Sequence, residues 1–198
     1  MLEKNSINPK TIAEVGCGAG EILNQLYNVL PNDVHFTGYE IASDALALAK
    51  TREKERLHFK LENLLEKEVK FDSLLMMDVF EHVSDYLGVL KICKQKSTFT
   101  IFHILLDVSV QSVMRNKLIL ERKSLDHLHY FMKGTALATL EDSGYEILDY
   151  LYTAGSFEVK SNTFKSKFAF LPRKLLYAIN KDLAVKIFSG FSLLVLAK

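Results

Sequence analysis

The sequence lacks tryptophan, and it contains only two cysteines and three prolines among 198 residues. Cys17 and Cys93 lie far apart in apolar segments, so we expect buried free thiols in a reducing compartment, and therefore a cytoplasmic protein. No apolar run approaches the ~20 residues that are needed to span a bilayer. The polar opening Met1–Lys4 is not followed by the apolar core of a signal peptide.

Neither sign of charge dominates, because 25 Lys and Arg residues are matched by 24 Asp and Glu residues. The net charge of +1 provides no overall field that would attract nucleic acid, so DNA is not an expected partner. The hydrophobic share of 48% and the charged share of 25% are typical of a globular protein. The length suits one domain with a full core, and we expect a single domain over residues 1–198.

Strand-like and helix-like stretches alternate along the chain. Short apolar runs predict strands at 11–15, 34–39, 57–61, 71–77, 97–102, 145–152 and 191–197. Amphipathic patterns predict helices at 20–30, from 43 onward, at 84–94 and at 133–141, with Ser43 as an N-cap. Residues 103–124 are predicted to be partly helical, and Pro172 is predicted to divide the insert 153–189 into two short helices. The alternation predicts parallel βαβ units with helices on both faces of the sheet.

Three glycines alternate at Gly16, Gly18 and Gly20, directly after the apolar run that contains Glu14. A helical pattern begins at Glu21. Glycine lets a backbone turn sharply and approach a ligand closely, and a helix N-terminus offers unpaired N–H groups. The loop is therefore predicted to hold a small ligand. A dinucleotide fingerprint would place its third glycine at position 21, where a glutamate stands instead.

The pattern Glu14-x-Gly16-x-Gly18-x-Gly20 resembles the first motif of the class I (Rossmann-like) S-adenosylmethionine-dependent methyltransferases. Asp78-Val-Phe-Glu-His-Val83 resembles the fourth motif of the small-molecule type, similar to ubiquinone-type O-methyltransferases. The resemblance covers about residues 10–150, with a weaker match at the C-terminal strand. It implies a mostly parallel seven-stranded sheet with an antiparallel C-terminal strand.

The resemblance implies S-adenosyl-L-methionine as cofactor and S-adenosyl-L-homocysteine as product. Glu40, at the end of its strand, would accept hydrogen bonds from the ribose hydroxyls, a role that would serve NAD equally well. Asn63 aligns with an Asp that accepts from the adenine amino group, and Glu62 is the alternative acceptor. Asp78 would lie beside the transferable methyl group. The expected cofactor-binding residues are Glu14, Gly16, Cys17, Gly18, Gly20, Glu40, Ile41, Glu62, Asn63, Leu64, Met77, Asp78 and Val79.

Histidine is the side chain best suited to accept a proton from a hydroxyl nucleophile near neutral pH. We expect His82 as the general base, with His127 and His129 as the next candidates. The latter two could also bind a metal ion as a pair, but no carboxylate or cysteine cluster matches them in the sequence, so no metal is expected. The other three histidines, His35, His58 and His103, have no motif context and are interpreted as structural.

Residues 1–9 form a short polar lead, residues 10–102 the cofactor-binding core, and 103–126 and 153–189 are insertions on the substrate side. The second insertion interleaves Phe and Tyr with Lys. This mixture favours a core-packing subdomain with a basic face, and the alternative is a peripheral membrane contact through 157–188 that grips a lipid-linked acceptor. RNA is not expected, because no stacking platform is present.

These features predict a methyltransferase that acts on a small-molecule or lipid-like acceptor, preferentially at oxygen. A non-catalytic methyltransferase-like binding module is the first alternative. An NAD-dependent oxidoreductase is less favoured, because the third fingerprint glycine and a Tyr-x-x-x-Lys pair are missing. The acceptor and the oligomeric state do not follow from the sequence.

Overall fold

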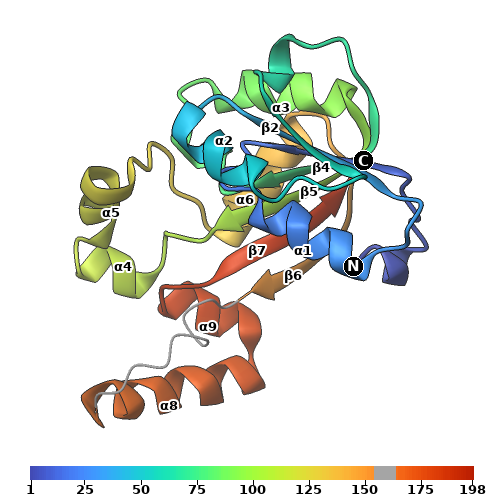
Figure 1. The fold of residues 1–198 in the computed structure, drawn as a ribbon. Coiled ribbons are helices and arrows are strands. Elements are labelled where there is room, and N and C mark those ends of the chain that lie inside the picture. The colour runs from blue at the N-terminus through green and yellow to red at the C-terminus, as the bar shows by residue number, and fades with distance from the viewer. Residues whose placement is uncertain (154–163) are drawn as a thin grey trace.

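The computed structural model describes the backbone of residues 1–153 and 164–198, and the side chains of 1–153 and 172–198. Within these residues, a seven-stranded sheet has the order β3-β2-β1-β4-β5-β7-β6 (Figure 1). Its strands are β1 (Thr11–Val15), β2 (His35–Glu40), β3 (Leu57–Leu61), β4 (Phe71–Met77), β5 (Ser97–Leu105), β6 (Ile147–Thr153) and β7 (Ser192–Ala197). The strands therefore fall close to the ranges that the apolar runs predict.

The pairing within the sheet is parallel from β3 through β5, and β7 is antiparallel to both β5 and β6. The predicted mostly parallel sheet with an antiparallel C-terminal strand is thus confirmed. Because β7 lies between β5 and β6, the sheet differs from the 3-2-1-4-5-6 order of the dinucleotide-binding fold.

The helices cover both faces of the sheet, as a parallel sheet requires (Figure 1). α1 and α2 pack on one face, and α3 and α6 pack on the other. The described helices are α1 (Glu21–Val29), α2 (Ser43–Lys50), α3 (Tyr86–Gln95), α4 (Val110–Met114), α5 (Lys117–Leu125), α6 (Lys133–Asp142), α8 (Phe164–Ile179) and α9 (Lys181–Ile187), with 3-10 turns at Glu3–Asn5, Leu64–Glu66 and Phe80–His82.

Strand β4 shows why this sheet needs two layers of helices. Leu74, Leu75 and Met76 are consecutive and are all buried, so their side chains enter the cores on both faces. Burial of each such side chain stabilises the fold by roughly 1.5–3 kcal/mol. The parallel strands share one carboxyl edge, and the connections that follow β5 and β6 leave from this edge (Figure 1).

Two local predictions are wrong. Pro172 does not divide the insert, because it lies inside α8, and the helices separate instead at Asn180, whose side chain accepts the Leu183 N–H. Ser43 is the first residue of α2 rather than its N-cap, and the neighbouring Ala42 N–H is bound by the Glu40 carboxylate.

Part of the predicted insert 153–189, and with it part of the segment 157–188, falls outside the described residues. Among the helices that the structure does describe, we find none with the length and hydropathy needed to cross a membrane.

Candidate active site

A cavity of ≈ 220 Å³ opens at the carboxyl edge of the sheet, beside the ends of β1, β2 and β3. Ligands in open α/β sheets bind at this edge. The cavity is smaller than the ~300–1,000 Å³ typical of whole-ligand pockets, and suits the nucleoside part of a ligand. It is lined by Val15, Gly16, Tyr39, Ile41, Glu62, Asn63, Leu64, Leu65, Val79, Val83 and Val89. The sequence motifs from four separate segments therefore meet in one place.

The glycine loop has no room for side chains at two of its three positions. Gly16 has φ +66°, and a Cβ there would lie 3.1 Å from Val79 Cγ2. Gly20 has φ +76°, and a Cβ there would lie 2.4 Å from Phe59 Cζ. Gly18 has φ +53°, but a Cβ at this position would meet nothing among the described atoms within 4 Å. Gly18 is therefore the glycine that faces open space.

Glu40 holds the glycine loop against the end of β2. Its Oε2 accepts the Gly18 N–H at 2.8 Å, and its Oε1 accepts the N–H groups of Ile41 and Ala42 at 2.8 and 2.9 Å. A carboxylate offers about four lone-pair sites. The expected ribose contact is therefore compatible with Glu40 only through the remaining site, or after one backbone N–H has been released.

Glu14 is a second acid beneath the same loop, and it is 1% exposed. Its Oε2 has no hydrogen-bond partner within the described part of the chain. Burial, and then the neighbouring charge of Glu40, raises the pKa of Glu14 to about 8. A buried acid with a raised pKa, next to an open loop, is typical of a functional site, because a bound cation would stabilise its charged form.

Cys17 fills space rather than presenting a reactive thiol. It is buried, and its Sγ would lie 2.7 Å from a Cβ placed at Gly38. Burial, followed by the charges of Glu14 and Glu40, raises the pKa of the Cys17 thiol to about 12. The thiol therefore stays protonated at neutral pH and is a poor nucleophile.

Asn63 begins the turn beside the cavity. Its Oδ1 accepts the Leu65 N–H at 3.1 Å, and its Nδ2 donates to Glu66 Oε1 at 2.9 Å. Glu62 forms an ion pair with Lys67 at 3.3 Å. Both predicted adenine acceptors thus line the cavity, and the amide of Asn63 retains a second lone pair on Oδ1.

Asp78 lies at the carboxyl end of β4 with φ +53°, a left-handed conformation that is uncommon for any residue except glycine. Its Oδ1 lies 2.6 Å from His103 Nδ1, and His103 Nε2 lies 3.0 Å from Thr153 Oγ1. No motif in the sequence predicts that His103 lies beside Asp78. The available signal was the sheet itself, because the ends of β4 and β5 are neighbours and Met77 is in register with His103.

The three predicted catalytic histidines gather around the 3-10 turn Phe80–His82. His82 is exposed, with its Nδ1 3.4 Å from the Asp126 carbonyl and its ring 5.0 Å from that of His127. His129 Nε2 donates to the Val83 carbonyl at 2.9 Å. None of the three is among the described residues that line the cavity.

Glu81, between Phe80 and His82, is a buried acid that contacts the backbone of the segment carrying His127 and His129. It is 1% exposed, and neither carboxylate oxygen has a hydrogen-bond partner in the described ranges. Burial raises the pKa of Glu81 to about 7, and the charges of Asp78 and Asp107 add to this rise. Its backbone carbonyl accepts the N–H groups of Leu128 and His129, which ties the segment after α5 to the end of β4.

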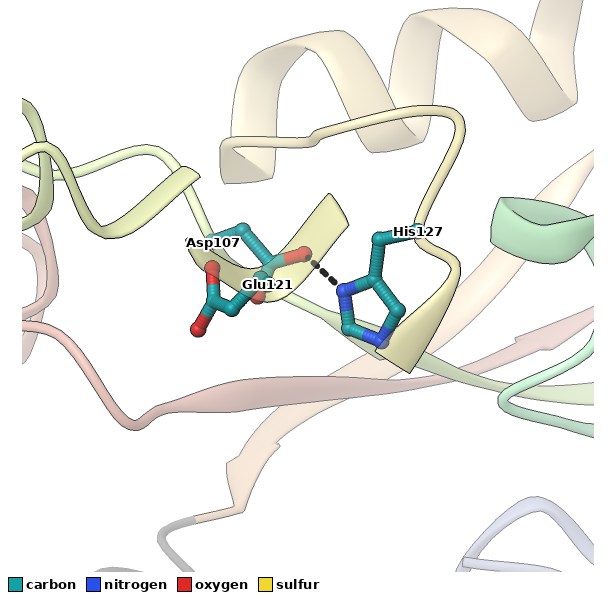
Figure 2. A group of neighbouring side chains, drawn as sticks. All are labelled: Asp107, Glu121 and His127. Atoms are coloured by element: carbon teal, nitrogen blue, oxygen red, sulfur yellow. Dashed lines mark hydrogen bonds and ion pairs between the residues drawn. The ribbon is translucent and has the colours of Figure 1, made fainter. Parts of the chain in front are cut away.

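The expectation that no carboxylates accompany His127 is wrong. Asp107 and Glu121, which are distant in sequence, lie next to it in the structure (Figure 2). His127 Nδ1 is 3.0 Å from Asp107 Oδ2. The sequence could not show this cluster, because it forms only when α5 folds back onto the end of β5.

Residues 13–98 match the family described as "Methyltransferase domain". The chain also matches a malonyl-[acyl-carrier protein] O-methyltransferase of Bacillus anthracis, with 31% identity over 83 residues, which is 40% of this chain. The matched part spans only 30% of that relative's length.

Solved structures give the same result for the fold. One similar structure is a magnesium protoporphyrin IX methyltransferase of Synechocystis with bound S-adenosylhomocysteine. The match covers 99% of this chain and 77% of that chain, with 13% identity and a TM-score of 0.65. The complex of the Haloferax volcanii methyltransferase activator Trm112 with a putative methyltransferase matches 95% of this chain and 81% of that chain, with 11% identity and a TM-score of 0.67. The chain therefore has the Rossmann-like methyltransferase fold, and its resemblance to the class I methyltransferases is confirmed.

Proposed function

We propose that the protein is an S-adenosyl-L-methionine-dependent methyltransferase that acts on a small-molecule or lipid-linked acceptor at oxygen. The observation that carries this proposal is the cavity, in which Gly16, Ile41, Asn63 and Val79 meet at the carboxyl edge of a methyltransferase sheet. When bound, the cofactor supplies a methyl group that its sulfonium has already activated. S-adenosyl-L-homocysteine is then the product that remains in the site.

The residues of this chain fit both the nucleobase and the positively charged part of such a cofactor. The apolar wall formed by Leu64, Val79 and Val89 suits a flat nucleobase, and Asn63 offers an acceptor for its amino group. Gly18 faces open space, so backbone can approach a ligand there. Glu14 and Glu40 place two acids beneath the loop, where a ligand that carries positive charge would be stabilised.

The acceptor side of the site holds two candidate bases. His82, the general base that the sequence predicts, is exposed. His103 is held between Asp78 and Thr153, and a carboxylate at one ring nitrogen orients the ring. Because Asp78 is 42% exposed and lies next to the cavity-lining Val79, we assign this pair to the alignment of the acceptor hydroxyl.

Exposed apolar residues favour a lipid-linked acceptor over a small polar one. On α4 and α5, Met114 is 80% and Leu120 is 60% exposed, and on α8, Ile179 is 74% exposed. These helices belong to the connections that leave the carboxyl edge of the sheet (Figure 1). An apolar surface on the substrate side suits an acyl or prenyl chain, and the exposed Lys174 and Lys181 suit an anionic headgroup.

The decisive experiment is titration calorimetry with S-adenosylhomocysteine and, separately, with NAD. We expect binding of the first at one site per chain and no binding of the second. Gly18→Val should abolish this binding, because the side chain would fill the open space and strain a backbone at φ +53°. Gly144→Val, at φ +91° after α6, imposes a comparable backbone strain away from the glycine loop and should leave binding intact. Unchanged affinity in Gly18→Val would remove the loop from the site. Binding of neither ligand to the unmodified protein would favour a non-catalytic module.

A further inference from the structure

Asp107, Glu121 and His127 form a cluster of metal-ligating types that lies outside the cofactor cavity (Figure 2). They come from three segments: the residues after β5, helix α5, and the residues that lead to α6. One potential ligand atom from each lies within 4.8 Å of the other two. The three residues are 9%, 7% and 3% exposed, so water screens their charges poorly.

Glu121 indicates that the cluster is incomplete as it stands. Its Oε1 forms an ion pair with Lys117 Nζ at 2.5 Å, but its Oε2 is buried and has no hydrogen-bond partner anywhere in the part of the chain that the structure describes. A buried carboxylate oxygen without a partner costs free energy, and such groups call for a physical explanation. A cation between Glu121, Asp107 and His127 would supply the missing partner.

We propose that Asp107, Glu121 and His127 bind one divalent transition-metal ion, of which Zn²⁺ is the best match. One imidazole nitrogen and two carboxylate oxygens form a mixed ligand set, which Ca²⁺ and Mg²⁺ use less readily than Zn²⁺ or Mn²⁺. Three protein ligands leave a fourth tetrahedral position for a water molecule or another oxygen ligand. This site goes beyond the proposed methyl transfer and does not depend on it.

Binding an ion requires only modest changes in the distances between the ligand atoms. Ligand atoms around a tetrahedral Zn²⁺ with bonds of ~2.0–2.1 Å lie about 3.4 Å apart. His127 Nδ1 and Asp107 Oδ2, at 3.0 Å, already lie near this separation, and the ion would replace the proton between them. The remaining separations, which reach at most 4.8 Å, would have to shorten by up to about 1.4 Å on binding.

The same three residues could instead be satisfied by a proton on His127, which would give a network of ion pairs with Lys117 and no metal. The two states differ in what they bind. A metal site takes up one equivalent of Zn²⁺ and is stabilised by it, because the ion binds the folded chain far better than the unfolded one. An ion-pair network shows neither property.

The test uses the full chain after dialysis against a chelator. We expect native mass spectrometry with ZnSO₄ to show one bound ion per chain, and the melting temperature to rise with added Zn²⁺. Glu121→Gln and His127→Ala should lose equimolar binding and the rise in melting temperature. Glu141→Gln, at an exposed position on α6, should retain both.

The absence of equimolar Zn²⁺ binding by the unmodified chain would overturn the proposal. Binding that survives in Glu121→Gln would overturn it equally, because the ion would then lie elsewhere. The conservative change at Glu121 keeps the size of the side chain, and a circular dichroism spectrum identical to that of the unmodified chain would show that any loss of binding is not caused by unfolding.

Discussion

At the scale of single residues, the two acids beneath the glycine loop have different roles. Glu40 accepts three backbone N–H groups, which leaves one acceptor site, and it shapes the loop. Glu14 is buried, has an oxygen without a partner within the described ranges, and has a pKa raised to about 8. Glu40 therefore acts through geometry, and Glu14 is the acid whose charge a ligand can change.

The raised pKa of Glu14 predicts that cofactor binding releases a proton below about pH 8. In the free protein the carboxyl is mostly protonated below this pH, and a cationic ligand favours the ionised form. Affinity should therefore rise as the pH approaches 8 and level off above it. Titration calorimetry in buffers of different ionisation enthalpy measures the released proton directly.

Glu14→Gln should abolish this proton release and flatten the dependence of affinity on pH. Glu55→Gln, an exposed acid in a turn, is the matched control and should change neither. Equal proton release in the unmodified protein and in Glu14→Gln would assign the titration to another group.

The raised pKa of Glu14 also predicts that the free energy of unfolding falls as the pH rises toward 8. The folded-state pKa of about 8 lies above the ordinary value of 4.5 for a glutamate. The contribution of the neutral carboxyl is thus fully present below about pH 4.5 and is lost as the pH rises through about 8, because the unfolded chain ionises first. We expect Glu14→Gln to reduce the loss of stability between pH 5 and about 8, as measured by urea unfolding at a series of pH values.

The general base can be identified by comparing two histidine variants. Loss of a true base lowers kcat by about 10²–10⁴ and leaves cofactor affinity nearly unchanged. We expect this result for either His82→Ala or His103→Ala, measured by methyl transfer to extracted metabolites and lipids. His58→Ala, on the exposed side of β3, is the control. A rate that is unaltered in both variants would show that alignment alone supports the reaction.

At the scale of elements, Asp72 joins the first residues of β4 to those of β1. Its Oδ2 accepts the N–H groups of Lys10 and Thr11 at 2.8 and 2.9 Å, and Thr11 Oγ1 in turn accepts the Asp72 N–H at 2.9 Å. These hydrogen bonds hold the pKa of Asp72 below its usual range. The contact therefore stabilises the ionised form.

We expect Asp72→Ala to lower the free energy of unfolding at neutral pH by about 1–3 kcal/mol, because charge-assisted hydrogen bonds are lost. The folded-state pKa is depressed, so the contribution is present above the unfolded pKa and is lost as the pH falls through the folded pKa. Urea unfolding at pH 7 and at low pH measures both effects. A difference from the unmodified protein that persists undiminished at low pH would contradict this account.

The strands and the first helices were predictable from the sequence for a physical reason. Parallel strands covered on both faces are continuous apolar runs, such as Leu74–Met76, and glycines and prolines mark their ends. The prediction that Pro172 divides the insert was wrong, because Pro172 lies inside α8. A helix can continue through a proline when the rest of the helix outweighs the one hydrogen bond that the proline removes.

The candidate site was predictable only where its residues follow one another in motifs. Gly16, Asn63 and Val79 belong to such motifs and line the cavity. His103 and the Asp107–Glu121–His127 cluster do not, because their proximity comes from strand register and from the fold of α5. The spacing of residues in the sequence does not predict contacts of this kind.

At the scale of the whole molecule, apolar residues are exposed on more than one of the helices that follow β5 and β6. Leu175 and Ile179 on α8 are 62% and 74% exposed, next to the exposed cations Lys174 and Lys181. Apolar side chains flanked by lysines bind anionic lipid surfaces through both burial and charge. This face of the molecule therefore fits the proposal of a lipid-linked acceptor.

We expect the protein to co-sediment with vesicles that contain anionic phospholipid, and this binding should weaken as salt is raised. Ile179→Glu should reduce it severalfold. Val29→Glu, at an equally exposed position on α1, is the matched control and should not. Equal binding to neutral and anionic vesicles would contradict the electrostatic part, and no binding to either would favour a small soluble acceptor.

The position of β7 affects how the chain folds during synthesis. β7 follows all other strands in the sequence, yet it lies between β5 and β6. When the ribosome has completed Thr153, β6 has no neighbour to pair with until Ser192 emerges, which at ~5–20 residues per second takes about 2–8 seconds. Until then, β5 and β6 both expose open backbone edges, so nascent chains stalled in this interval should be the most prone to aggregate.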